Sequence, residues 1–243
     1  NGEKIVSACL KNIYIWDVHT GQCIDTLKGH TQGVNSVFFS FDGEKIVSAS
    51  SDSTIRIWEI SSGICMNTLL GHKKPVISAT FSYDGKKIVS ITKDNTIRIW
   101  NASTGLCLDT LNVTYMGPYW LREAISLHSA KFSHDGQKIV STSWDGTIRI
   151  WDVITGECID TLIDRHPLLY SADFSSDGKK IVSQTCSGIV YIWEIEKKQI
   201  LDSLEGIYFV TSCHDMNGFI FASKEGYIYH WNENTGLCSD SIK

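Results

Sequence analysis

The sequence has little proline, no excess of basic residues and no long apolar run, and each absence narrows the class of protein. Only three prolines occur in 243 residues, of which 42% are hydrophobic, so the chain is neither collagen-like nor disordered. The formal net charge of −5 provides no basic footprint for nucleic acid or anionic lipid. No apolar run approaches the roughly 20 residues that a membrane helix needs. We expect a globular protein without nucleic-acid or membrane partners.

The beginning of the chain lacks an initiator Met and the charged and apolar regions of a secretory signal peptide. We therefore expect an intracellular, cytoplasmic protein and a chain that is a fragment of a longer one. Eight cysteines occur without any CxxC pair. Five of them stand at equivalent positions of a sequence repeat that is described below: Cys23, Cys65, Cys107, Cys158 and Cys238. Residues one repeat apart are too distant to share a metal ion or a disulfide. The five cysteines predict reduced thiols that serve as small, half-buried packing residues, and no metal site.

What the sequence does contain is a repeat of about 42 residues. Its clearest copies are KIVSASSDSTIRIW at 45–58, KIVSITKDNTIRIW at 87–100 and KIVSTSWDGTIRIW at 138–151, and tryptophan closes each of six units at Trp16, Trp58, Trp100, Trp151, Trp193 and Trp231. Each unit holds four short runs rich in Ile, Val and Thr, and Asp-Gly between the first two is a strong hairpin signal. The pattern predicts four-stranded antiparallel sheets that stack on one another, without long helices.

The repeat resembles the WD-repeat β-propeller family, on the evidence of its period, the Gly-His before the first strand, and the Trp-Asp or Trp-Glu that ends the third. The resemblance covers essentially the whole chain. It implies an all-β toroidal propeller, most often with seven blades, that serves as a scaffold for protein or peptide partners.

In that frame we expect five complete blades and one partial blade, belonging to a seven-bladed ring that these residues do not close by themselves. The first unit lacks its innermost strand. The predicted blades are residues 1–27 (partial), 28–70, 71–111, 112–162, 163–204 and 205–243.

Two sets of Ser, His and Asp could be mistaken for a hydrolase triad. The first is His30, Ser48, Asp52 and Trp58, and the same types recur 42 residues later at His72, Ser90, Asp94 and Trp100. A catalytic triad has no reason to be duplicated in successive blades. In the family that the chain resembles, these types form a buried hydrogen-bond chain from the indole to the turn Asp. We expect structural tetrads, and neither a catalytic residue nor a cofactor site.

A candidate partner site lies around the fourth unit, where about nine extra residues are inserted between Leu111 and Leu127. Interface hot spots are rich in Trp, Tyr and Arg, and the repeat itself does not require Trp144. We expect the partner to bind Tyr115, Tyr119, Trp120, Arg122, His128, Trp144 and Tyr170. The strand-opening positions Asn35, Ile77 and Val210 could extend this surface. The alternative is that the insert folds over Trp144 and buries it.

The most favoured function is a non-enzymatic scaffold that presents loops on one propeller face to a protein or peptide. An alternative is a sensor or autoinhibitory propeller within a larger signalling ATPase. A propeller hydrolase or a lectin-like, ligand-binding propeller is a third hypothesis, which depends on fold analogy alone.

Overall fold

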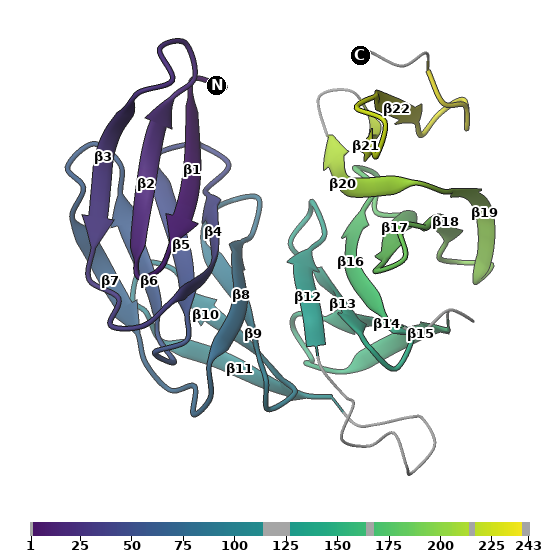
Figure 1. The fold of residues 1–243 in the computed structure, drawn as a ribbon. Coiled ribbons are helices and arrows are strands. Elements are labelled where there is room, and N and C mark those ends of the chain that lie inside the picture. Colours follow the sequence, from purple (N-terminus) through teal and green to yellow (C-terminus); the bar gives the residue numbers. More distant parts are fainter. Residues whose placement is uncertain (1, 114–126, 164–167, 214–216, 240–243) are drawn as a thin grey trace. The chain divides into compact units, whose positions relative to one another are not determined.

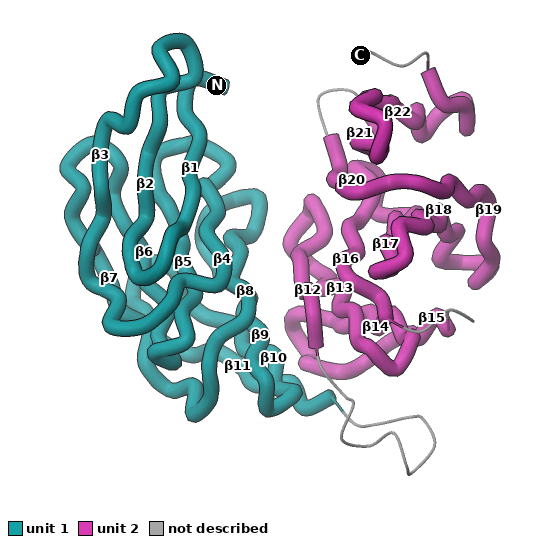
Figure 2. Tube along the Cα trace, viewed as in Figure 1, with its two compact units in different colours: residues 1–114 teal, residues 115–243 magenta. Residues whose placement is uncertain are grey.

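This computed structural model describes residues 2–113, 127–163, 168–213 and 217–239 (Figure 1), and the chain divides into two compact units, residues 1–114 and 115–243 (Figure 2). Strands and turns make up these described ranges, which contain no helix, so the all-β prediction is confirmed there. The described ranges therefore hold no helix that is long and apolar enough to cross a membrane.

The first unit contains three antiparallel sheets, with strands paired in chain order. The first has three strands: β1 (Lys4–Cys9), β2 (Asn12–Asp17) and β3 (Cys23–Lys28). The second has four: β4 (Val34–Phe39), β5 (Lys45–Ser50), β6 (Ile55–Glu59) and β7 (Cys65–Leu69). The third has four: β8 (Val76–Phe81), β9 (Lys87–Thr92), β10 (Thr96–Asn101) and β11 (Cys107–Asn112).

The second unit repeats this arrangement in three further sheets. The first contains β12 (Leu127–Phe132), β13 (Lys138–Ser143), β14 (Thr147–Asp152) and β15 (Cys158–Ile163). The next contains β16 (Leu169–Phe174), β17 (Lys180–Thr185), β18 (Val190–Glu194) and β19 (Gln199–Leu204). The last contains β20 (Ile207–Cys213), β21 (Gly218–Ser223) and β22 (Ile228–Asn232).

The six sheets have the strand order expected of propeller blades, and the predicted partial first blade is a three-stranded sheet. The fourth strand expected in the last blade is represented by an isolated bridge between Trp231 and Cys238, and residues 240–243 lie outside the described residues. The exact blade boundaries and the seven-bladed ring stay predictions.

The core of each unit lies between neighbouring sheets. The second strand of each complete four-stranded blade is buried almost throughout, as in β5, where Ile46, Val47 and Ala49 are fully buried. Side chains of β5 and β6 pack against Val76, Ala79 and Ile88 of the following blade. Each such aliphatic side chain contributes roughly 1.5–3 kcal/mol on burial. A single blade cannot cover both of its faces, so packing against the neighbours stabilises it.

The innermost strand of five blades opens with a β-bulge. In β12, Leu127 pairs with Ser143 and Ser129 with Thr142, which leaves His128 as the extra residue. The same irregularity places four further residues at this point: Asn35, Ile77, Tyr170 and Tyr208. A bulge redirects the side chain of its extra residue. The bulge positions therefore present a row of side chains at the start of the innermost strands.

The expectation that Val210 stands at this point in the last blade is wrong. Val210 pairs with Phe221 and is only 4% exposed, whereas Tyr208 occupies the bulge and is 66% exposed. Tyr208 stands 23 residues before the closing Trp231, the same spacing as Asn35 before Trp58, so the expectation had placed the last unit two residues too late in the repeat.

Candidate functional site

The residues of the first candidate triad form a buried hydrogen-bond chain in the second blade. The Trp58 indole N–H donates to Ser48 Oγ at 2.9 Å, and Ser48 Oγ lies 2.8 Å from His30 Nε2. His30 Nδ1 lies 2.9 Å from Asp52 Oδ2. A carboxylate can only accept, so Nδ1 carries the proton and Nε2 accepts from the Ser48 hydroxyl. The chain of donors therefore runs from indole to serine, from serine to histidine and from histidine to aspartate.

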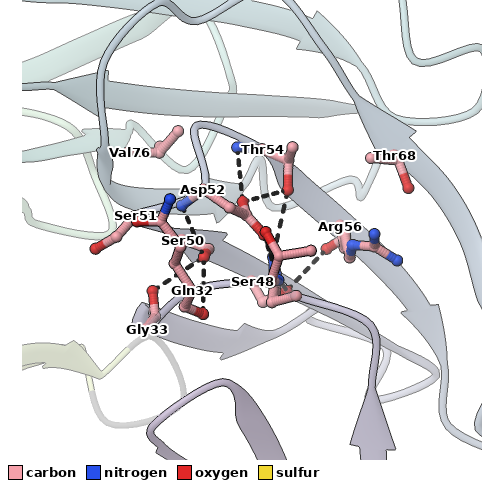
Figure 3. Close-up of polar contacts among 12 residues, drawn as sticks. Gln32, Gly33, Ser48, Ser50, Ser51, Asp52, Thr54, Arg56, Thr68 and Val76 are labelled. Atoms are coloured by element: carbon pink, nitrogen blue, oxygen red, sulfur yellow. Dashed lines mark hydrogen bonds and ion pairs between the residues drawn. The ribbon is translucent and has the colours of Figure 1, made fainter.

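The turn carrying Asp52 is fixed by further bonds, some of which Figure 3 shows. Asp52 Oδ1 accepts from the backbone N–H and the hydroxyl of Thr54, and Oδ2 accepts from the N–H of Thr31. Ser50 Oγ donates to the carbonyl of Gly33 at 2.9 Å. The aspartate therefore ties the β5–β6 turn to the segment that enters β4.

This geometry does not suit nucleophilic catalysis. Ser48 is fully buried, and its oxygen already accepts the indole proton while its own proton goes to His30. A serine nucleophile needs an open side toward the substrate carbonyl. The chain instead satisfies polar groups that would be costly to bury unpaired.

In the third blade the expected tetrad is incomplete, and the expectation that Asp94 belongs to it is wrong. The Trp100 indole donates to Ser90 at 2.8 Å, and His72 Nε2 lies 2.7 Å from the same oxygen. Asp94 accepts instead from Thr92 and Thr96, and His72 Nδ1 has no hydrogen-bond partner among the described residues. Thr92, which replaces the serine of the second blade, holds the carboxylate within its own turn.

The other blades retain only part of the chain. The indole donates to a serine in three of them, through the pairs Trp16–Ser7, Trp151–Ser141 and Trp193–Ser183. In the fourth blade, Asp145 forms a buried ion pair with Arg149 at 3.3 Å. In the last blade Phe221 stands where the serine should be, and the Trp231 indole N–H is buried without a partner in the described part of the chain.

Burial and hydrogen bonding shift the pKa values of these groups. Burial opposes the charge of Asp52, but hydrogen bonds from Thr54, Thr31 and His30 outweigh it and lower the pKa of Asp52 to about 2. Burial lowers the pKa of His30, against the opposing effect of Asp52. Burial, with Arg98 nearby, lowers the pKa of His72 to about 4. Both histidines are therefore neutral near pH 7.

Three of the predicted partner-binding residues come together in the second unit. The His128 ring stacks on Trp144, with centroids 4.7 Å apart and planes 19° from parallel. The Tyr170 ring lies 5.8 Å from His128. Trp144 is 38% exposed and Tyr170 56% exposed. We call these three residues the aromatic cluster. The bulges of β12 and β16 supply two of them, and the β13–β14 turn supplies the third.

The other predicted partner residues, Tyr115, Tyr119, Trp120 and Arg122, lie outside the described residues. Burial lowers the pKa of His128, so this ring is neutral where it stacks on Trp144. Trp144 is 38% exposed, and the alternative in which the insert buries it concerns residues outside the described ranges.

The structure also reveals a rule that links the bulge to a turn in the same blade. In three of the five bulged blades, the residue sixteen positions after the bulge, which follows the second strand, contacts the bulge residue, as in the hydrogen bonds of Asn35 with Ser51. His128 and Trp144 have the same spacing, and so do Tyr208 and Lys224, whose Nζ lies 5.2 Å from the ring centroid. We call these bulge–turn pairs.

Sequence reasoning missed Tyr208, Phe209 and Lys224. Tyr208 and Phe209 are 66% and 57% exposed, and Phe209 stands where the other four bulged strands have serine. The constant spacing of sixteen residues could have identified Tyr208 and Lys224, because it requires only the sequence. Counting back 23 residues from Trp231 gives the position to which it applies.

Neither metal nor disulfide chemistry has a recognisable centre in the described ranges. No group of three His, Cys, Asp or Glu residues lies close enough there to hold a metal ion. All eight cysteines are free. Of the five equivalent cysteines only Cys65 is half-buried, and the other four are exposed, contrary to the packing role expected from their spacing.

Comparison with known proteins identifies the repeat. A family model described as "WD domain, G-beta repeat" matches residues 21–59, 63–101, 123–152 and 156–194, which is more than half of the chain. Nuclear distribution protein PAC1 of Arthroderma otae is 47% identical over 57 residues, which are 23% of this chain and 12% of that protein. Pre-mRNA-processing factor 19 of Mus musculus is 50% identical over 46 residues, 19% of this chain and 9% of that protein.

A third relative is Periodic tryptophan protein 2 of Saccharomyces cerevisiae, 41% identical over 58 residues, 23% of this chain and 6% of that protein. In each case the matched segment is a small part of a much longer relative. The matches therefore concern the repeat, and not the relatives as whole proteins.

The two turn aspartates should differ in their effect on stability. Asp52→Ala removes four accepted hydrogen bonds, including that of His30, and should lower the free energy of unfolding by roughly 1–3 kcal/mol. Asp94→Ala removes bonds within one exposed turn and should cost less. Urea unfolding of both variants measures the difference. Equal losses in the free energy of unfolding would show that the His30–Asp52 contact, which the third blade lacks, does not contribute to stability.

His72 should make stability depend on pH. The unfolded chain protonates this ring near pH 6.5 and the folded chain only near pH 4, so below pH 6.5 the unfolded state binds more protons. The free energy of unfolding should therefore fall as the pH drops from 6.5 to 4. His72→Gln should reduce that fall by an amount on the order of 2 kcal/mol.

Urea midpoints at pH 7 and pH 4.5 measure this effect. His19→Gln, at an exposed position of the first blade, is the matched control. If both variants show the same pH dependence as the parent protein, His72 does not make the assigned contribution.

Proposed function

Because the chain belongs to the WD-repeat family, whose repeat covers more than half of it, we propose that it is a non-enzymatic scaffold that binds a protein or peptide partner. The described part of the chain supports this in two ways. Its one arrangement of Ser, His and Asp is buried and fully used for hydrogen bonding within a blade. Several of its exposed aromatic side chains, Trp144, Tyr170 and Tyr208, stand at bulge positions or at the turn beside one.

The observation that carries the proposal is the aromatic cluster. A stacked histidine–tryptophan pair beside a tyrosine leaves large apolar area in water, because Trp144 and Tyr170 remain 38% and 56% exposed. Exposed patches of this kind usually mark interaction sites, and Trp and Tyr dominate interface hot spots. The predicted residues Tyr115, Tyr119, Trp120 and Arg122 extend the proposed site in the sequence.

The cluster is also held in place rather than merely exposed. His128 and Tyr170 extend from bulges whose flanking residues, Leu127 and Leu169, are fully buried. Rigid aromatic side chains lose little conformational entropy on binding, so such a surface is suited to a partner of modest size. An intracellular, cytoplasmic location is part of the proposal, since eight free cysteines suit a reducing compartment.

Peptide selection tests the proposal directly. A library of random twelve-residue peptides displayed on phage is selected on the intact chain, and the enriched peptides are then synthesised and titrated. Trp144→Ala should weaken their binding by roughly tenfold, the effect of a hot-spot truncation. Phe41→Ala is the matched control, because Phe41 is a 56% exposed aromatic residue in the first unit whose ring contacts that of Tyr83.

Thermal melting of each variant accompanies the titration. Peptides that bind Trp144→Ala as tightly as the parent chain, together with a lower melting temperature of that variant, would show that the cluster serves packing alone. An enriched peptide that depends on Phe41 instead would move the site to the first unit.

A further inference from the structure

A pocket of about 280 Å³ lies beside the aromatic cluster and shares Tyr170 with it. The fifth and sixth blades form its walls, and the residues that matter for its chemistry are Tyr170, Thr185, Ser187, Gly188, Tyr208 and Lys224. It is bounded by two successive bulge–turn positions, Tyr170 with Cys186 and Tyr208 with Lys224. Its size suits one side chain of a ligand rather than a whole ligand.

Among the described residues that line this pocket, Lys224 alone carries a charged side chain. Its ammonium lies 5.2 Å from the centre of the Tyr208 ring, which holds it near the pocket wall. No carboxylate forms an ion pair with Lys224 among the described residues. Lys224 also borders a second hollow, whose lining includes the acidic residues Glu205 and Glu225.

The repeat also shows that an acid has been lost here. The turn position that holds Asp52, Asp94 and Asp145 in other blades holds Ser187 in the fifth. The Ser187 hydroxyl lies 2.8 Å from that of Thr185, so two neutral hydroxyl groups replace a carboxylate. A positive side chain therefore faces a pocket from which the usual negative group is absent.

Gly188 keeps the wall close to the following blade. Its backbone has φ of +85°, and a Cβ there would lie 3.1 Å from the carbonyl oxygen of Ile207. The pocket is thus narrow on this side and is bordered by backbone and hydroxyl groups. The carbonyl oxygen of Ile207 can only accept, so on this side a bound acceptor would take its hydrogen bond from the hydroxyl pair of Thr185 and Ser187.

From this arrangement we propose that the pocket binds the carboxylate of an Asp or Glu side chain in an extended peptide, whose neighbouring apolar residue packs on the aromatic cluster. This inference rests on the proposed function and specifies the chemistry of its partner. Charge complementarity carries it: the described lining has one lysine without an ion pair and no acid, and it shares Tyr170 with the aromatic cluster. The partner is thus a segment of another protein that has an Asp or Glu for the pocket and, next to it, an apolar residue that contacts the aromatic cluster.

Two displayed libraries of ten-residue peptides test the charge preference, one with a fixed central Glu and one with a fixed central Lys. The intact chain should enrich the Glu library, and Lys224→Glu should reverse that preference. Lys179→Glu is the matched control, because it makes the same charge change at an exposed lysine of the β16–β17 hairpin, at the opposite end of β17. It should leave the preference unchanged.

The tightest Glu-containing peptide is then synthesised with Gln, Lys or phosphoserine in place of Glu. Glu→Gln should weaken binding by about three- to fivefold, as for a solvent-exposed ion pair, and less so in high salt. Stronger, Lys224-dependent binding of the phosphoserine peptide would overturn the carboxylate assignment in favour of a phosphopeptide.

The outcomes separate the two proposals. Peptides that depend on Trp144 but show no preference for Glu, or none that Lys224→Glu reverses, would overturn the acidic-peptide inference and leave the scaffold proposal intact. If neither library yields a peptide sensitive to Trp144→Ala, the aromatic cluster is not the binding site and the proposed function fails first.

Discussion

Burial of a blade's second strand on both faces is the constraint on which the rest of this structure depends. It places the serine of that strand and the indole of the next one in the interior, where each must find a hydrogen-bond partner. The indole–serine bond meets this requirement in five of the six sheets. What surrounds that bond varies from blade to blade. His30 and Asp52 complete it in the second blade, while Arg149 takes over the aspartate in the fourth.

The same constraint separates the structural residues from those free to contact a partner. Polar groups that serve the interior are repeated because every blade has the same interior to build. Side chains at the bulge and at the following turn point away from it, and there the repeats differ. Asn35 with Ser51, His128 with Trp144 and Tyr208 with Lys224 occupy equivalent places with unrelated chemistry. Because the fold does not constrain the side chains at these bulge and turn positions, they can differ between blades and determine which partner binds.

The sequence was sufficient to predict the strands, because period-2 runs, Asp-Gly turns and closing tryptophans recur with little change. It also predicted that His128, Trp144 and Tyr170 lie close together. It was insufficient in two places. Asp94 has the residue type and spacing of a tetrad member. In the third blade, however, Thr92 replaces Ser50, and its hydroxyl donates to Asp94 and holds that carboxylate within its own turn. Tyr208 was missed because the last unit was placed two residues too late in the repeat, since its text is degenerate.

The central claim is that blade indoles hold the fold together while Trp144 meets the partner, and one NMR experiment examines both parts. The indole N–H signals of the eight tryptophans are recorded before and after adding a selected peptide, and their exchange with deuterium is followed. The account predicts slow exchange and unchanged shifts for Trp58, Trp100, Trp151 and Trp193, whose indoles donate to buried serines, and a peptide-dependent shift for Trp144. Fast exchange of those blade indoles, or a peptide that shifts them and leaves Trp144 unchanged, would contradict it.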